Sequence, residues 1–284
     1  ALFSAFALRV RASGCAPRTR GAPGLIGLGY RHRSFIHSST ARASNRTNRP
    51  SLMWGIPCAI DVLSNLPFAL WALVGGWALW GTRASGHSAL VATSPHRGCA
   101  TLFFAGLAVT AVGSTWYHLQ PNDAGLALDR LGMVAAFAGL LGLAVADRVS
   151  ARSGMVTAAL VLLAGPLAVG VWAQTGNVLP WAVVQFGGML LVVGLACFKP
   201  PHAGAGLPLG AIIAIYAVAK AFEMADHAIY DLTAHTVSGH SLKHIVASFA
   251  AWPVVRAMWP TGMPRLATKS GQNGPQTTKT KAVA

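Results

Sequence analysis

The sequence is poor in charged residues, and acidic residues are the scarcest: 7 of the 284 residues are Asp or Glu, against 22 Lys or Arg. Charged residues make up 10% of the chain, whereas they make up about 25% of a typical soluble domain. Hydrophobic residues reach 54%. This balance argues against a soluble protein and favours a polytopic membrane protein.

Patterns typical of disulfide frameworks and nucleotide sites are also absent. The four cysteines, Cys15, Cys58, Cys99 and Cys197, have no CxxC spacing, so neither a disulfide framework nor a cysteine zinc site is indicated. No GxxxxGK[ST] or GxGxxG motif follows a strand-like run, and the alternation of apolar and polar residues that is typical of strands is missing. We therefore expect an all-α protein without a nucleotide site.

The net charge of +15 is concentrated near the N-terminus. Residues 1–50 contain nine arginines and no acidic residue, and the first acid of the chain is Asp61. A basic leader rich in Ser, Ala and Gly is typical of an organelle transit peptide, and a disordered basic tail is the alternative. Because the charge is not spread along the chain, we expect no nucleic acid as a partner.

Seven apolar runs follow the leader, each long enough for the roughly 20 helical residues that cross a bilayer. Residues 51–260 are therefore predicted to form an all-α bundle of seven transmembrane helices, and residues 261–284 a disordered polar tail. The break between the fourth and fifth helices is expected at the turn residues Gln174 to Asn177. The predicted helices cover about residues 59–80, 98–118, 125–146, two parts of 153–200, 207–230 and 240–259.

Basic residues in the short loops predict the orientation of this multi-pass protein. The loops 119–126, 174–178 and 231–239 contain no Lys or Arg, so in a seven-helix arrangement all the basic loops fall on the other side. We expect the C-terminus to be cytosolic, or on the equivalent face of an organelle membrane if the leader is a transit peptide. The basic leader fits this orientation only if it is removed, which favours a transit peptide.

Five polar side chains are expected near one membrane surface, on the side of the N-terminus. Ser114 and His118 are four residues apart at the end of the second helix, and His240 and His244 are four apart at the start of the seventh. Residues with this spacing share a helix face. A short loop returns the chain to Asp129, at nearly the depth of His118. Each residue alone has an ordinary explanation, but their agreement in depth predicts a site.

Three neutral imidazoles with an open fourth position suit a catalytic zinc ion. We therefore predict His118, His240 and His244 as ligands of Zn²⁺. Asp129 is the predicted acceptor of a proton from the water, and Ser114 the group that holds the water or donates to an oxyanion. A haem is a weaker alternative, because two histidines on one face of one helix cannot both be its axial ligands.

The sixth apolar run contains further polar residues in a membrane context. We predict a structural ion pair between Lys220 and Glu223, with Asp226 turned toward Arg130 or water. In the alternative interpretation, these charges line an entrance for a polar head group. The strongest rivals to the predicted zinc ligands are His227 and His235.

Three motifs in fixed order connect the chain to a known family. They are Gly113-Ser-Thr-Trp-Tyr-His118, Leu128-Asp-Arg-Leu131 and Ser238-Gly-His-Ser-Leu-Lys-His244. With these motifs on helices two, three and seven, the chain resembles the membrane hydrolase superfamily that includes alkaline ceramidases and adiponectin receptors. It is most similar to the bacterial-type branch of the alkaline ceramidase family, which tends to have a first helix like Asp61-Val-Leu-Ser-Asn-Leu-Pro67. The similarity spans about residues 54–258.

The resemblance implies a seven-helix hydrolase that acts on the carbon–nitrogen bond of a linear amide. Zinc would be held by His118, His240 and His244, with water positioned by Ser114 and Asp129. The substrate would be a ceramide-like lipid from the bilayer, and the products a sphingoid-type base and a fatty acid. No protein partner is inferred.

Two further expectations concern calcium and an alternative function. The animal enzymes hold a calcium ion among acids before the first helix, but residues 51–60 contain no acid, so that site is not carried over. Asp61 and Asn65 are expected to cap or pack the first helix instead. The alternative function, suggested by the receptor relatives, is a seven-helix sensor or binding protein whose zinc is structural.

Overall fold

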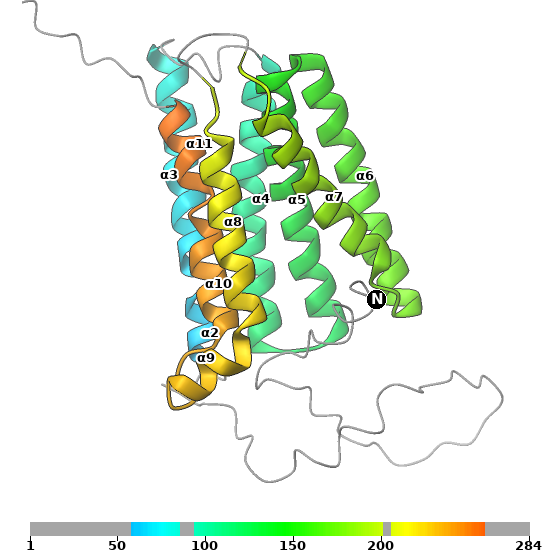
Figure 1. The fold of residues 1–284 in the computed structure, drawn as a ribbon, viewed down its shortest axis with the longest axis vertical. Coiled ribbons are helices and arrows are strands. Elements are labelled where there is room, and N and C mark those ends of the chain that lie inside the picture. The colour runs from blue at the N-terminus through cyan, green and yellow to red at the C-terminus, as the bar shows by residue number, and fades with distance from the viewer. Residues whose placement is uncertain (1–57, 86–93, 201–205, 259–284) are drawn as a thin grey trace, which may run out of the picture.

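The computed structural model describes residues 58–85, 94–200 and 206–258. Within these ranges all regular structure is helical, without a strand, and the helices form an elongated bundle (Figure 1). The all-α prediction is confirmed for this part of the chain. The predicted leader, residues 1–50, and the predicted tail, residues 261–284, lie outside the described residues.

Five segments of the described chain are long and apolar enough to cross a membrane, by length and composition. The first combines α2 (Ala59–Leu63) with most of α3 (Leu66–Ser85). Each of the other four is a single helix that agrees with a predicted run to within a few residues. These helices are α4 (Ser94–Leu119), α5 (Asp123–Arg148), α6 (Ala151–Thr175) and α7 (Leu179–Ala196). The described helices are thus compatible with a multi-pass membrane protein.

The turn between α6 and α7 lies where the sequence predicted it. Gly176 ends α6 with a φ of 72°, in the left-handed region that glycine adopts without a steric penalty. Its N–H donates to the Trp172 carbonyl over 2.8 Å. The long apolar stretch therefore divides into two helices at this glycine.

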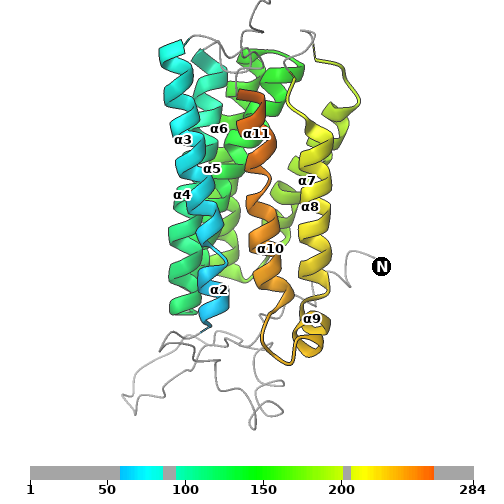
Figure 2. The same cartoon turned by 90° about the vertical axis from the view of Figure 1, so that its left-hand side faces the viewer.

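Two of the predicted helices are interrupted, and each interruption is followed by a proline. A proline ring clashes with the carbonyl of the residue four positions earlier and offers no N–H. Pro67 accounts in this way for the break between α2 and α3, and Pro253 for the break between α10 (Gly239–Ser248) and α11 (Ala251–Met258). The prediction of continuous helices over 59–80 and 240–259 was wrong at these points, although α11 continues the path of α10 (Figure 2).

The predicted sixth helix, residues 207–230, is also divided. It consists of α8 (Leu209–Met224) and α9 (Asp226–Leu232), which meet at Ala225. The start of α10 packs against this junction so closely that a Cβ on Gly239 would lie 2.2 Å from the Phe222 carbonyl oxygen. This close approach brings the first turn of α10 against the end of α8.

Glycines let α4 and α5 approach until their backbones touch. A Cβ added at Gly106 would lie 2.1 Å from the Ala136 nitrogen, and one at Gly113 would lie 2.9 Å from the Leu128 carbonyl oxygen and 3.3 Å from the Asp129 Cα. Small residues at helix contacts allow such packing in membrane proteins. The end of α4 and the start of α5 are therefore held side by side at one depth.

The apolar core runs through the bundle and includes side chains that are almost fully buried, such as Leu141 and Met258. Cys99 is a buried free thiol within this core, and Cys197 is an exposed free thiol.

Candidate metal centre

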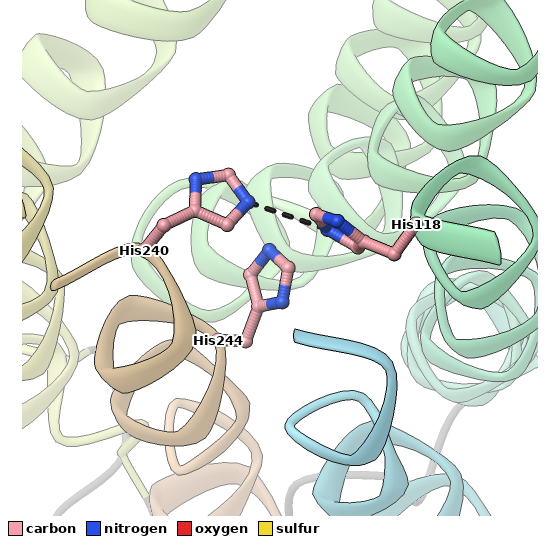
Figure 3. Close-up of side chains that lie close together, drawn as sticks. All are labelled: His118, His240 and His244. Atoms are coloured by element: carbon pink, nitrogen blue, oxygen red, sulfur yellow. Dashed lines mark hydrogen bonds between the residues drawn. The ribbon is translucent and has the colours of Figure 1, made fainter. Parts of the chain in front are cut away.

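Three histidines from two helices converge at one end of the bundle (Figure 3). His118 lies in the last turn of α4, and His240 and His244 lie in the first turns of α10. One ring nitrogen from each lies within 4.8 Å of the others. The structure thus brings together the three residues that the sequence predicted as ligands.

The spacing of the ring nitrogens suits a shared ion. The Nε2 atoms of His118 and His240 are 3.3 Å apart, and two nitrogens bound at about 2.0–2.1 Å to one tetrahedral ion are also separated by about 3.3 Å. The ring of His244 packs edge-on against both, with centroid distances of 5.2 Å to His118 and 4.5 Å to His240. All three side chains point into the same small space (Figure 3).

The chemistry of this donor set also fits a metal ion. His118 and His244 are buried, with 5% and 7% of their surface exposed, and no carboxylate belongs to the group of close donors in the described chain. Neutral imidazoles whose ring nitrogens face one another can all be ligands of one bound cation. The three histidines could therefore hold a metal ion.

Ser114 and Asp129 lie beside this cluster. Ser114 precedes His118 by one turn and is 1% exposed, and its hydroxyl has no hydrogen-bond partner among the described residues. The close approach at Gly113 places Asp129 next to α4, where its carboxyl group lies near the Ser114 hydroxyl and the Lys243 ammonium. Asp129 is not one of the close donors. The catalytic roles of both residues stay predictions.

The short helix α2 and the residue that ends it, Ser64, contact α10 and His244. The Asp61 carboxylate accepts hydrogen bonds from the hydroxyls of Ser238 and Ser241 in the first turn of α10. Ser64 Oγ lies 3.1 Å from Nδ1 of His244. The side chain of Asn65 is fully buried and donates to the Asp61 carbonyl, which confirms its predicted packing role. Asp61, expected only to cap or pack its own helix, also binds α10.

The predicted ion pair between Lys220 and Glu223 is present, with 2.5 Å between Nζ and Oε2. Lys243 joins it from α10, and its ammonium lies 3.3 Å from Oε1 of Glu223 and 3.3 Å from Nδ1 of His240. No role was predicted for Lys243 from its sequence context. This lysine connects the ion pair of α8 to His240 of the histidine cluster.

Asp226 was predicted to turn toward Arg130 or water, and of these two partners Arg130 is not the one that it binds. The Asp226 carboxylate accepts a hydrogen bond of 2.8 Å from the backbone N–H of His240, because the first N–H groups of a helix have no partner within the helix. The Arg130 guanidinium instead stacks on the Trp172 ring at 3.9 Å. Asp226 therefore fixes the start of α10, and Arg130 packs toward α6.

The two rival histidines lie outside the cluster. His227 is exposed on α9. His235 is also exposed and lies 3.4 Å from Asp231, with its ring against Tyr230. Neither belongs to the group of close donors. The structure thus favours the predicted three histidines over both rivals.

Comparison with protein-family models finds no model that matches this chain, and comparison with curated proteins finds no significant match.

Proposed function

We propose that this protein is a membrane-embedded, zinc-dependent hydrolase that cleaves the amide bond of a ceramide-like lipid. The observation that carries the proposal is the convergence of His118, His240 and His244 beside Ser114 and Asp129. When bound, zinc supplies a Lewis acid and lowers the pKa of a water ligand to about 7. The motif resemblance supports an amide as the bond that is attacked.

Asp129 and Ser114 would perform the proton transfer and the charge stabilisation. Asp129 accepts a proton from the attacking water, whose oxygen bonds to the carbonyl carbon, and it returns the proton to the amine when the carbon–nitrogen bond breaks. The Ser114 hydroxyl, which lies near the Asp129 carboxyl group, would donate its hydrogen to the developing oxyanion. The products are a fatty acid and a sphingoid-type amine.

In this proposal the chain crosses the membrane seven times. Beyond the five long segments, α8 with α9 would form the sixth crossing, and α10 with α11 the seventh. Residues Gly239 to Met258 provide about the 20 residues that a crossing needs. The basic residues at the opposite end, Arg97 and Arg148 among them, support the prediction that this end is cytosolic and that the proposed zinc site lies near the other surface.

An apolar groove on α3 and α4 supports a lipid as the substrate. It has a volume of about 300 Å³ and is lined mainly by apolar side chains. Asn65, Thr115 and Leu119 contribute to it. Thr115 and Leu119 directly follow Ser114 and His118 in sequence, and Asn65 follows Ser64, whose hydroxyl contacts His244. An acyl chain in this groove would have its polar end close to the histidines.

The test is product release from a panel of N-acyl lipids, ceramide among them, by the purified full chain. Wild-type protein should release a fatty acid from at least one lipid, and Asp129→Asn should bind zinc without turnover. If wild-type protein binds zinc but stays at background on every lipid, the protein is instead a sensor or binding protein with a structural zinc.

A further inference from the structure

Ser64 makes two hydrogen bonds that together define which ring nitrogen of His244 carries the proton. Its hydroxyl lies 2.7 Å from the backbone carbonyl oxygen of Asp61 and 3.1 Å from Nδ1 of His244. The side chain is 4% exposed, so water does not compete for either contact. Ser64 ends α2, and its side chain faces the neighbouring helix α10.

The direction of these two bonds follows from the single proton of the hydroxyl. A carbonyl oxygen can only accept, so Ser64 donates its proton to Asp61. The 2.7 Å separation is typical of O–H···O bonds, and 3.1 Å lies within the range of N–H···O bonds. The Ser64 oxygen must then accept a proton from His244, which places the ring proton on Nδ1.

A proton on Nδ1 leaves Nε2 of His244 with its lone pair free. Figure 3 shows the second ring nitrogen of His244 directed toward His118 and His240. Histidine binds a metal as the neutral ring, and the hydrogen bond at the other nitrogen sets which atom is the ligand. The contact from α2 thus prepares His244 to bind an ion through Nε2.

Helix α2 also fixes the start of α10, the helix that carries His244. Ser238 caps α10 by accepting from the Ser241 N–H over 3.0 Å, and both serine hydroxyls donate to the Asp61 carboxylate. Asp61 and Ser64 are one turn apart, so α2 holds the first turn of α10 and the ring of His244 together.

We infer that Ser64 is a positioning residue of the metal centre, which fixes the ring orientation and the Nδ1–H tautomer of His244. The inference rests on the proposed zinc site but not on the identity of the substrate. Partners in this outer layer typically change metal affinity by about 10–100-fold.

The test compares zinc dissociation constants, measured by competition with a chelator, for the full chain in detergent. Ser64→Ala should weaken zinc binding about 10–100-fold, and Ser64→Thr, which keeps the hydroxyl, should restore most of it. Ser248→Ala is the matched control, because Ser248 is also buried and donates to the carbonyl three residues earlier, Ile245. It should bind zinc like the wild type.

Equal zinc affinities of Ser64→Ala and the wild type would overturn the inference, whereas a wild type that binds no zinc would overturn the proposed function. The tautomer is read independently from ¹⁵N spectra of the metal-free wild type with labelled histidine, with the His244 signals assigned by their absence in His244→Gln. The Nδ1–H form is expected, and the Nε2–H form contradicts the inference even if Ser64→Ala fails to fold.

Discussion

The two ends of the bundle each contain a buried polar cluster. In one cluster opposite charges pair with each other, and in the other three imidazoles lie together. At the far end of α5, the side chains of Asp147 and Arg148 form an ion pair and also bind the backbone N–H and carbonyl of Leu207. At the other end of the bundle, where α4 ends and α10 begins, the three imidazoles face one another. At the far end the two charges pair with each other and with one backbone residue, whereas the histidine end directs several ring nitrogens into one space.

This difference separates a structural contact from a binding site. The Asp147 cluster joins α5 to the segment before α8 without any ligand, so it should contribute to stability alone. The three imidazoles at the other end could hold a cation in the space that they share. Variants at the two ends should therefore change different properties, and four of them test the comparison.

The largest effect is expected for His244→Ala. Loss of one of three ligands should remove zinc binding and reduce lipid hydrolysis to background, since the remaining two imidazoles cannot complete the site. Metal analysis of the purified protein, together with an assay of product release, measures both. His235→Ala is the control, because this exposed histidine lies against Asp231 and Tyr230, away from the cluster, and the variant should keep the metal.

Asp129→Asn should reduce hydrolysis by roughly 10²–10⁴-fold and leave zinc bound, because removal of a general base has an effect of this size. The rate is measured on the best lipid of the panel, with zinc content determined on the same sample. Asp123→Asn, an exposed carboxylate in the first turn of the same helix, should be near wild type. If both variants lose the same activity, Asp129 has no special role.

Asp147→Ala should lower the free energy of unfolding by about 3–5 kcal/mol, because it leaves the buried Arg148 without its counter-charge. Unfolding in detergent at rising temperature measures the change. The folded fraction should still bind one zinc per chain with wild-type affinity. If the variant has normal stability but has lost its zinc, the assignment of stability to one end and metal binding to the other is contradicted.

The smallest effect is expected for Gly113→Ala. The added Cβ would lie 2.9 Å from the Leu128 carbonyl oxygen and should force α4 and α5 apart, at a cost of about 1–3 kcal/mol. Because this contact places Asp129, hydrolysis should fall more than zinc binding does. Gly98→Ala, at the other end of α4, meets no atom within 4 Å and should be neutral or slightly stabilising.

Much of the fold could be predicted because membrane helices are marked by long apolar runs. The helices α4 to α7 follow these runs, and the turn at Gly176 follows a local preference of glycine. The interruptions were missed because the apolar runs continue across them. Pro67 and Pro253 were the available signals, and each acts on the carbonyl four residues earlier.

The metal centre could be predicted for a similar reason. Spacing of four residues places His240 and His244 on one helix face, and a short loop brings α4 and α5 to the same depth. The contacts that support these ligands could not be predicted. Ser64 meets His244 across 180 positions of sequence, and nothing local to α2 indicates which helix will lie against it.

X-ray absorption at the zinc edge of the purified wild-type protein tests the central claim most directly. The account predicts one zinc per chain with three imidazole nitrogens at about 2.0–2.1 Å and one oxygen from water. A protein that holds no zinc after gentle purification, or a zinc ion with sulfur ligands, would contradict it.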